Sequence, residues 1–122
     1  MSISAAESRI MEALWRRSPL TAEEIVADVA GPQGWSEATV KSLVNRLLTK
    51  GAIDAEKVGR RYLYSPRVDR LAYVSHESWG LLDRLFGGRI APLVSHFSQT
   101  NQLSPEDIAE LKRLIAELDD DR

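Results

Sequence analysis

The sequence has no cysteine among its 122 residues, and its only histidines are His76 and His96. The lack of cysteine excludes disulfides, thiolate metal sites and a cysteine nucleophile. No apolar run approaches the roughly 18 residues that span a bilayer, and the N-terminus lacks the basic start and apolar stretch of a signal peptide. We therefore expect a cytoplasmic protein with no membrane partner, no metal site and no cofactor.

Motifs for enzymatic chemistry are also lacking. The sequence shows no Ser-His-Asp arrangement, metal-ligand cluster or phosphate-binding loop, and Gly87-Gly88 is an isolated glycine pair. The two histidines lie on separate predicted helices without a second ligand at useful spacing, which is typical of surface or interface histidines. We expect that the protein is not an enzyme. The alternative, a small hydrolase built on His76 or His96, requires that mutation of that histidine abolish activity.

The chain as a whole has no excess of positive charge, but one stretch does. The formal net charge is −2 and the pI is about 5.7. Residues 1–67 hold 10 basic and 8 acidic residues, whereas residues 68–122 hold 6 and 10. Within residues 39–67 there are 7 basic and 2 acidic residues. This stretch suits the phosphates of nucleic acid, although a solvated surface would show the same count.

Two capping boxes begin the first two predicted helices. Ser4 with Glu7, and Thr21 with Glu24, have the Ser/Thr-x-x-Glu spacing in which side chains and backbone satisfy each other's free N–H groups. The first helix is expected to run to about residue 17, where a Ser-Pro step stops it. The second is expected to end at residues 31–34, Gly-Pro-Gln-Gly, which predict a turn.

A third helix and a β-hairpin follow. Ser36 can cap a helix that continues to about Lys50, and the next residue is a glycine, which favours a helix end. The β-compatible runs 52–58 and 61–65 flank a Gly-Arg pair and predict a two-stranded hairpin. Three short helices followed by a hairpin is the order of a winged helix-turn-helix. We expect residues 1–67 to form such a domain.

The third predicted helix indicates a function. Its apolar residues fall within about 140° of the helical circumference, and the opposite face has no glutamate between residues 38 and 50. An ordinary exposed face would mix glutamate with lysine. Arginine can bond guanine, asparagine can bond adenine, and threonine can contact the thymine methyl group or a phosphate. The polar face contains Ala38, Thr39, Lys41, Ser42, Asn45, Arg46, Thr49 and Lys50.

The predicted hairpin offers a second cationic surface. Arg60 and Arg61 stand at its tip, and Lys57 lies shortly before the turn. Guanidinium groups there suit the DNA backbone or the minor groove. Charge at a hairpin tip also discourages edge-to-edge aggregation. Because the third helix precedes the hairpin at the spacing of a wing, we favour the DNA interpretation.

Residues 68–122 predict three more helices, at about 69–86, at about 89–98 and from Ser104 onwards. Their apolar stripes need a partner to bury them, and a two-fold homodimer is the commonest solution. The last helix has apolar residues at spacings of 3, 4 and 3, which is the beginning of a coiled-coil seam. We therefore expect a mostly α fold with a small β-hairpin wing and a helical dimerisation domain at 68–122. The expected interface residues are Leu82, Leu85, Phe86, Leu93, Phe97, Ile108, Leu111 and Ile115.

Several blocks of the sequence resemble a known family. Residues 35–53 read Trp-Ser-x-x-Thr-Val-Lys-x-Leu-x-Asn-Arg-Leu-x-x-Lys-Gly-x-Ile, and residues 59–66 read Gly-Arg-x-Tyr-x-Tyr-x-Pro. The similarity extends to residues 7–15, 20–25 and 103–111. These motifs are similar to those of the penicillinase-repressor family of winged-helix regulators (BlaI/MecI/CopY type).

The resemblance implies a transcriptional repressor that binds a palindromic operator on double-stranded DNA as a homodimer. It implies a third helix (about 36–50) in the major groove, a wing (about 57–62) on the backbone and a dimer formed by the last three helices. Among the matching residues, we favour Arg46 and Thr39 for base contacts, and Lys41, Lys50 and Arg60 for phosphates. The DNA-facing residues carried over by position are Ser36, Thr39, Lys41, Ser42, Asn45, Arg46, Lys50, Arg60 and Arg61.

The sequence departs from the family pattern in two places. The copper-responsive branch carries a C-terminal cysteine cluster, which this chain lacks. The β-lactam-responsive branch is cleaved before a phenylalanine, typically after asparagine, whereas the matching pair here is His96-Phe97. A signalling protease as a partner would therefore have to accept histidine. A winged helix that binds another protein instead of DNA remains an alternative, which the overall acidity permits.

Overall fold

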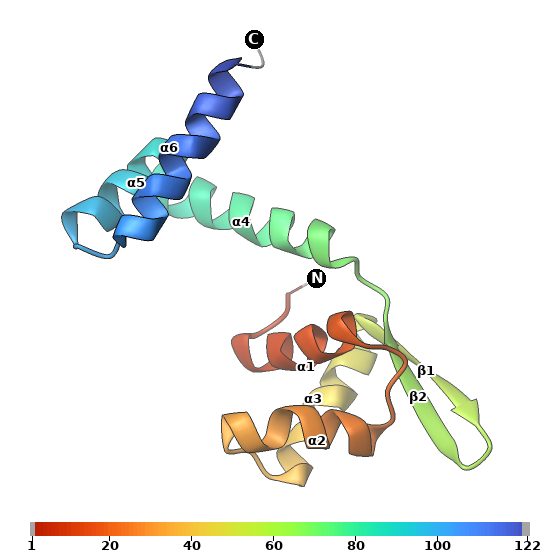
Figure 1. Cartoon of the computed structure of the whole chain (residues 1–122). Coiled ribbons are helices and arrows are strands. Elements are labelled where there is room, and N and C mark those ends of the chain that lie inside the picture. The colour runs from red at the N-terminus through yellow and green to blue at the C-terminus, as the bar shows by residue number, and fades with distance from the viewer. Residues whose placement is uncertain (1, 121–122) are drawn as a thin grey trace. The chain divides into compact units, whose positions relative to one another are not determined.

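The computed structural model describes residues 2–120 and divides the chain into two compact units, with the division between Val74 and Ser75 (Figure 1). Among these residues, no helix is long and apolar enough to cross a membrane. The expectation of a mostly α fold with one β-hairpin is confirmed. The elements are α1 (Ala5–Arg16), α2 (Ala22–Gln33), α3 (Glu37–Lys50), β1 (Ile53–Val58), β2 (Arg61–Pro66), α4 (Arg70–Phe86), α5 (Ile90–Gln99) and α6 (Pro105–Asp120).

Both predicted capping boxes are confirmed. The Ser4 hydroxyl accepts from the Glu7 backbone N–H at 3.1 Å, and the Glu7 carboxylate accepts from the Ser4 N–H at 2.9 Å. Thr21 and Glu24 pair in the same way at the start of α2, at 3.2 and 2.9 Å. Each box satisfies two N–H groups that have no partner within the helix, so the starts of α1 and α2 are determined locally.

The turn predicted at residues 31–34 begins later than expected, because α2 continues through Pro32 to Gln33. Proline lacks a backbone N–H and so removes one hydrogen bond from the last turn of α2. The helix nevertheless continues for one more residue. The helix ends instead at Gly34, whose φ of 68° is left-handed and whose N–H bonds the carbonyls of Ala30 and Gly31. Such a C-terminal glycine reverses the chain within one residue, and α3 begins shortly afterwards.

The start and end of α3 follow the same local rules. The Ser36 hydroxyl accepts from the Thr39 N–H at 3.1 Å, as a helix cap does. Gly51 closes the helix with a φ of 78° and donates to the carbonyls of Leu47 and Leu48. Both predicted boundaries of this helix are confirmed. The helix is therefore held at each end by residues adjacent in sequence.

The hairpin is antiparallel, with its register running from Ile53↔Pro66 to Val58↔Arg61. Gly59 occupies the first position of the two-residue turn with a φ of 65°, as a type II′ turn requires. At the other end, Leu20 and Tyr64 exchange backbone hydrogen bonds of 3.0 and 2.8 Å. The base of the hairpin is therefore joined to the segment before α2, while its tip extends beyond the three helices (Figure 1).

The first unit has a closed hydrophobic core between α1, α2, α3 and the start of β1. Trp15 packs at its edge and donates from its indole N–H to the Val68 carbonyl at 2.8 Å, which holds the chain after the hairpin against α1. The fully or almost fully buried members are Ile10, Met11, Ala13, Leu14, Leu20, Ile25, Val29, Val40, Leu43, Val44, Leu47, Ala52 and Ile53.

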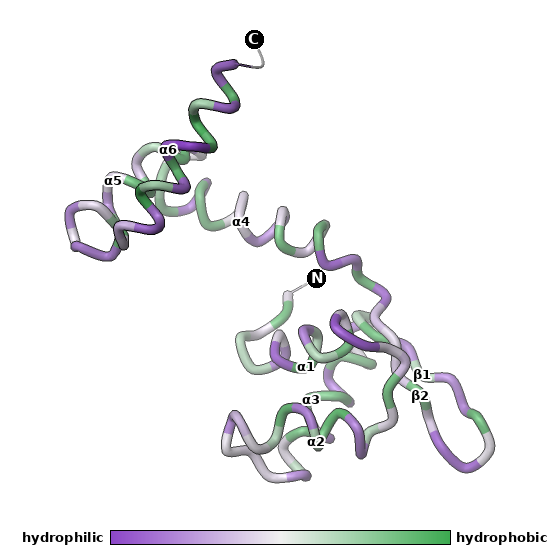
Figure 2. Tube along the Cα trace, in the orientation of Figure 1, coloured by the Kyte–Doolittle hydropathy of each residue, from purple (hydrophilic) through white to green (hydrophobic). Residues whose placement is uncertain are grey.

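The second unit consists of most of α4, together with α5 and α6. Gly87 and Gly88 separate α4 from α5 with φ values of 59° and 76°, which confirms the interruption predicted there. The Ser104 hydroxyl accepts from the Asp107 N–H at 3.0 Å and begins α6 as predicted. Figure 2 shows hydrophobic residues recurring along α6 between hydrophilic ones. From Ile108 to Leu118 they stand three or four positions apart, which indicates a helix with one apolar face.

Candidate nucleic-acid interface

Helix α3 has one buried face and one exposed face. Val40 and Leu47 are completely buried, and Leu43 and Val44 nearly so. The opposite side of the helix carries small polar and cationic side chains, with no acidic residue after Glu37. The exposed residues of this face, which we call the α3 polar face, are Thr39, Lys41, Ser42, Asn45, Arg46 and Thr49.

The side chains at the N-terminal end of α3 are held by local contacts. Ser36 not only caps the helix but lies 3.0 Å from the Thr39 hydroxyl, so the two hydroxyls share a hydrogen bond. A hollow of about 350 Å³ runs beside them, lined by Thr39, Ser42 and Arg46 with two neighbouring apolar residues. The small side chains leave room along this part of the helix for a ligand edge to approach the backbone.

Lys41 is less free than its position suggested. Its ammonium group lies 2.8 Å from a carboxylate oxygen of Glu37, one turn earlier. The hydrogen bond between them lowers the pKa of Glu37 and raises that of Lys41. Glu37 lies just before the glutamate-free stretch 38–50, and its i,i+4 spacing to Lys41 is the signal in the sequence that predicts this pair. Both side chains are exposed, so the pair is of little consequence for stability.

Lys50 lies at the opposite end of α3, and its ammonium group already has two partners within the fold. Its ammonium group is 2.5 Å from Glu7 Oε1 and 2.9 Å from the Ser2 carbonyl oxygen. The partners are separated from it by 43 and 48 positions in the sequence, so no local pattern could have revealed them. The predicted phosphate contact would require this side chain to leave two partners.

The remaining predicted cations are available for a ligand. Arg46 and Arg60 form no ion pair or side-chain hydrogen bond with another residue of the described part, 2–120. The pKa of Glu24 is lowered, chiefly by hydrogen bonds from Thr21. The positive charge of Arg61 also contributes to this lowering. Arg46 on α3 and Arg60 at the hairpin tip are therefore unneutralised positive charges within one unit.

The sequence profile of the penicillinase repressor family matches residues 3–117. The chain belongs to the penicillinase repressor family. The penicillinase repressor of Bacillus licheniformis is 32% identical over 115 residues, which cover 94% of this chain and 90% of that one. The methicillin resistance regulatory protein MecI of Mammaliicoccus sciuri is 27% identical over 113 residues, which cover 93% and 92%. Membership in a family of repressors contradicts the hydrolase alternative.

A solved structure within the penicillinase repressor family matches the first part of the chain. The monomeric form of Bacillus licheniformis BlaI, in complex with the blaP half-operator, aligns with a TM-score of 0.53 and 31% identity. The alignment covers 57% of this chain and 85% of BlaI in that structure. The winged-helix fold predicted from the sequence is thereby confirmed.

The residues expected at a dimer interface differ widely in exposure. Leu82 is buried, and Phe86, Leu93 and Leu111 are partly buried. The other four expected residues, Leu85, Phe97, Ile108 and Ile115, are exposed, with Leu85 at 64%.

The pair that matches the family's cleavage site lies on α5. His96 and Phe97 are both exposed, and their rings meet edge to face at a centroid distance of 5.4 Å. His76 lies on α4, and no group of metal-ligating residues forms within the described residues. The structure therefore brings the two histidines into no common site.

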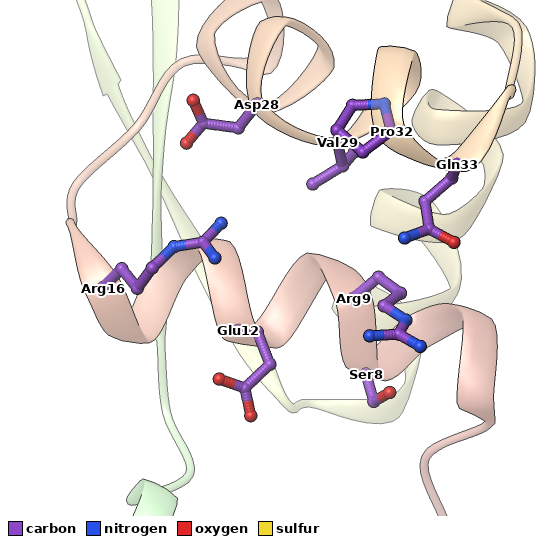
Figure 3. Close-up of a pocket in the computed structure, with 8 residues that line it drawn as sticks. All are labelled: Ser8, Arg9, Glu12, Arg16, Asp28, Val29, Pro32 and Gln33. Carbon is purple, nitrogen blue, oxygen red and sulfur yellow. The ribbon is translucent and has the colours of Figure 1, made fainter.

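A hollow of about 510 Å³ between α1 and α2 was not anticipated from the sequence. Figure 3 shows Arg16 and Asp28 extending into it from the two helices, and Arg9 and Glu12 also line it. Two positive and two negative side chains balance each other there. This hollow therefore lacks the unneutralised positive charge of the α3 polar face and the hairpin tip.

Proposed function

We propose that this chain is a transcriptional repressor that binds double-stranded DNA through α3 and the hairpin. The observation that carries the proposal is the α3 polar face, exposed on a winged helix, with Arg46 unneutralised among the described residues. Membership in the penicillinase repressor family supports repression, and the likeness to BlaI, solved with a half-operator, supports DNA as the ligand.

The α3 polar face fits the major groove. In helix-turn-helix proteins the recognition helix lies in this groove and its N-terminal residues contact base edges. We assign base contacts to Arg46 and Thr39, which stand two turns apart on one side of α3, with Asn45 beside them. The hairpin tip with Arg60 lies on the backbone. The proposed set is Ser36, Thr39, Lys41, Ser42, Asn45, Arg46, Arg60 and Arg61, without Lys50.

Selection of bound sequences from random DNA, followed by a salt titration, tests the proposal. A protein that neutralises several phosphates releases their counterions, so log affinity falls steeply with log salt concentration. We expect a selected site and a steep slope. If the winged helix binds a protein partner instead, selection returns no common sequence and weak binding varies little with salt.

We propose further that two copies form a homodimer through the second unit. Of its described residues, 75–120, only Leu82 is buried, while large apolar side chains stay exposed. Burying such surface is worth about 25 cal/mol per Å², and a second copy is the commonest partner. In B. licheniformis BlaI the solved complex joins a monomeric form to a half-operator. Two copies would then bind two half-sites of a palindromic operator.

In this assignment, residues 1–67 form the DNA-binding domain and residues 68–122 form the dimerisation domain. The first residues of α4 pack with the first unit, where the rings of Trp15 and Tyr73 lie 5.4 Å apart. The dimer interface comprises Leu82, Leu85, Phe86, Leu93, Phe97, Ile108, Leu111 and Ile115. A protein with these tasks works in the cytoplasm, the compartment that holds bacterial DNA.

Release from DNA by a signalling protease that cuts between His96 and Phe97 is the last part of the proposal. Both side chains are exposed, but the bond lies inside α5, where the His96 carbonyl accepts from the Thr100 N–H at 3.2 Å. A protease must therefore open this helix locally. Mass spectrometry of the protein from cells treated with a β-lactam tests the assignment: a fragment ending at His96 supports it, and intact protein after derepression contradicts it.

A further inference from the structure

The last residue of the recognition helix is joined to the first turn of α1 by an ion pair. Lys50 Nζ lies 2.5 Å from Glu7 Oε1 and 2.9 Å from the Ser2 carbonyl oxygen. The Glu7 side chain is 2% exposed, whereas that of Lys50 is 36% exposed. The carboxylate is therefore inside the protein, and the lysine reaches it from the surface.

Lys50 is the cation that pairs with the buried carboxylate of Glu7. Its Oε1 also accepts from the Ser4 N–H at 2.9 Å, but its Oε2 is buried without a hydrogen-bond partner among the described residues. Burial raises the pKa of Glu7, but hydrogen bonds from Lys50 and Ser4 together lower it further than burial raises it. A buried carboxylate whose cation is removed is strongly destabilising. Lys50 is the cation that offsets this cost.

The pair connects three parts of the first unit. Lys50 is followed by Gly51 and by Ala52, whose N–H donates to the Leu47 carbonyl and whose carbonyl accepts from the Arg67 N–H. The ion pair therefore joins the N-terminal segment to the end of α3, at the point where the two ends of the hairpin also meet. The residues after Lys50 therefore link the end of α3 to both strands of the hairpin.

We propose that Lys50 is a positioning residue, not a phosphate contact: its ion pair with Glu7 holds the C-terminal end of α3 and the base of the hairpin in the geometry that DNA binding requires. The inference rests on the proposed function for its DNA readout. A phosphate contact would have to break the pair and leave Glu7 buried without a cation, whereas Arg46 and Arg60 offer charge that no other described residue neutralises.

A double-mutant cycle tests the proposal. Lys50→Met removes the charge and keeps the aliphatic stem, and Glu7→Gln removes the carboxylate while a glutamine preserves the capping box. We expect each single variant to bind the selected DNA more weakly than wild type. The double variant should bind roughly threefold or more tighter than the two separate effects predict, because it leaves no buried unpaired charge.

The phosphate-contact hypothesis makes the opposite forecast. Glu7→Gln would either leave affinity unchanged, so that the two effects are independent, or free Lys50 and raise affinity. Lys50→Met would also reduce the salt slope by about 0.9 for each lost contact, with no change in thermal stability. Independent effects, or tighter binding by Glu7→Gln, would overturn the proposal. Lys57→Met is the matched comparison, because it removes one exposed positive charge of the wing that has no buried partner. It shows what the loss of a charge near the DNA does to the salt slope without an effect on the fold.

Thermal unfolding without DNA separates this inference from the proposed function. Lys50→Met should lower the Tm by about 5 °C or more, Lys50→Arg should restore it, and Lys57→Met should leave it near wild type. If wild type binds no DNA, the proposed function fails but the coupling between Glu7 and Lys50 in Tm remains.

If Lys50→Met does not fold, the structural role of Lys50 is supported, and DNA binding is then measured with Glu7→Gln. A Tm unchanged by Lys50→Met would overturn the inference.

Discussion

The two units of the chain bury their apolar residues to very different extents. In the first unit, Ile10, Met11 and Leu47 are completely inaccessible, and the surrounding core is closed by Trp15. In the described part of the second unit only Leu82 is buried, and Leu118 is 69% exposed. Both units contain amphipathic helices, so the difference lies in how many apolar faces find a neighbour within one copy of the chain.

Because of this difference, the two units depend on different contacts for their stability. The first unit draws its stability from contacts within the chain, and a folded DNA-binding surface therefore requires no second copy. The second unit has a groove of about 330 Å³ lined by Leu93, Phe97, Leu111 and other mostly apolar residues. Together with the exposed apolar residues of these helices, this groove is apolar surface that one copy of the chain leaves open to solvent. In our proposal a second copy supplies the missing contacts.

The largest expected effect comes from the same truncation made in each unit. Leu14→Ala removes a side chain that is 1% exposed and should reduce the free energy of unfolding of the first unit by about 2–5 kcal/mol. Leu85→Ala removes a side chain that is 64% exposed and should leave the free energy of unfolding of the first unit unchanged. Denaturant titration followed by tryptophan fluorescence measures both, and equal losses would remove the contrast between the units.

The second prediction concerns the exposed apolar residues as an interface. Leu85→Glu combined with Ile115→Glu places charges on side chains that are 64% and 57% exposed, so a single copy should fold normally. Loss of such contacts should raise the dimer dissociation constant roughly 30-fold or more, which analytical ultracentrifugation measures. Gln99→Glu adds a charge at an exposed polar position as a control. A wild-type protein that is monomeric at micromolar concentration would refute the dimer.

The third prediction compares two arginines of the first unit, Arg46 on the α3 polar face and Arg9 in the hollow between α1 and α2. Arg46→Ala should weaken binding to the selected DNA by about 1–3 kcal/mol and relax the preference at one position. Arg9→Ala removes an arginine from the charge-balanced hollow of the same unit and should change neither. Fluorescence anisotropy against matched and mutated sites measures both. Equal losses for the two variants would mean that another surface binds DNA.

The boundaries that could be predicted from the sequence are those determined by neighbouring residues. The capping boxes at Ser4 and Thr21, and the glycine after Lys50, act within one turn of helix and were therefore visible. The end of α2 is harder to predict, because Gly31 and Pro32 resemble a helix end as much as Gly34 does. The choice depends on which residue adopts the left-handed conformation, and composition does not specify this.

The candidate site could be predicted only where it depends on helical periodicity. The exposed and buried sides of α3 follow from the spacing of residues such as Val40 and Leu47. The partner of Lys50 could not be predicted, because Glu7 is 43 positions away and only the packing of α1 against α3 brings them together. The sequence therefore predicted which face carries charge, but not which charges are neutralised within the fold.

A fourth prediction uses the pH dependence of the first unit. The pKa of Glu7 lies below its ordinary value of about 4.5. A carboxyl group with a lowered folded pKa contributes stability above its unfolded pKa and loses it as pH falls through the folded value. The stability difference between wild type and Glu7→Gln should therefore be full above pH 4.5 and shrink below it. Thermal unfolding at several pH values measures this, and a difference constant with pH would contradict it.

The smallest expected effect on stability concerns Glu37, the one acidic residue on α3. Its ion pair with Lys41 is exposed to solvent, so Glu37→Gln should leave the Tm of the first unit unchanged. DNA affinity should nevertheless rise at low salt, because the substitution removes a negative charge beside the phosphates and frees Lys41. The gain should disappear at high salt, where exposed charges are screened. A gain equal at every salt concentration would mean that Glu37 acts through the fold, and no gain would place Lys41 away from the DNA.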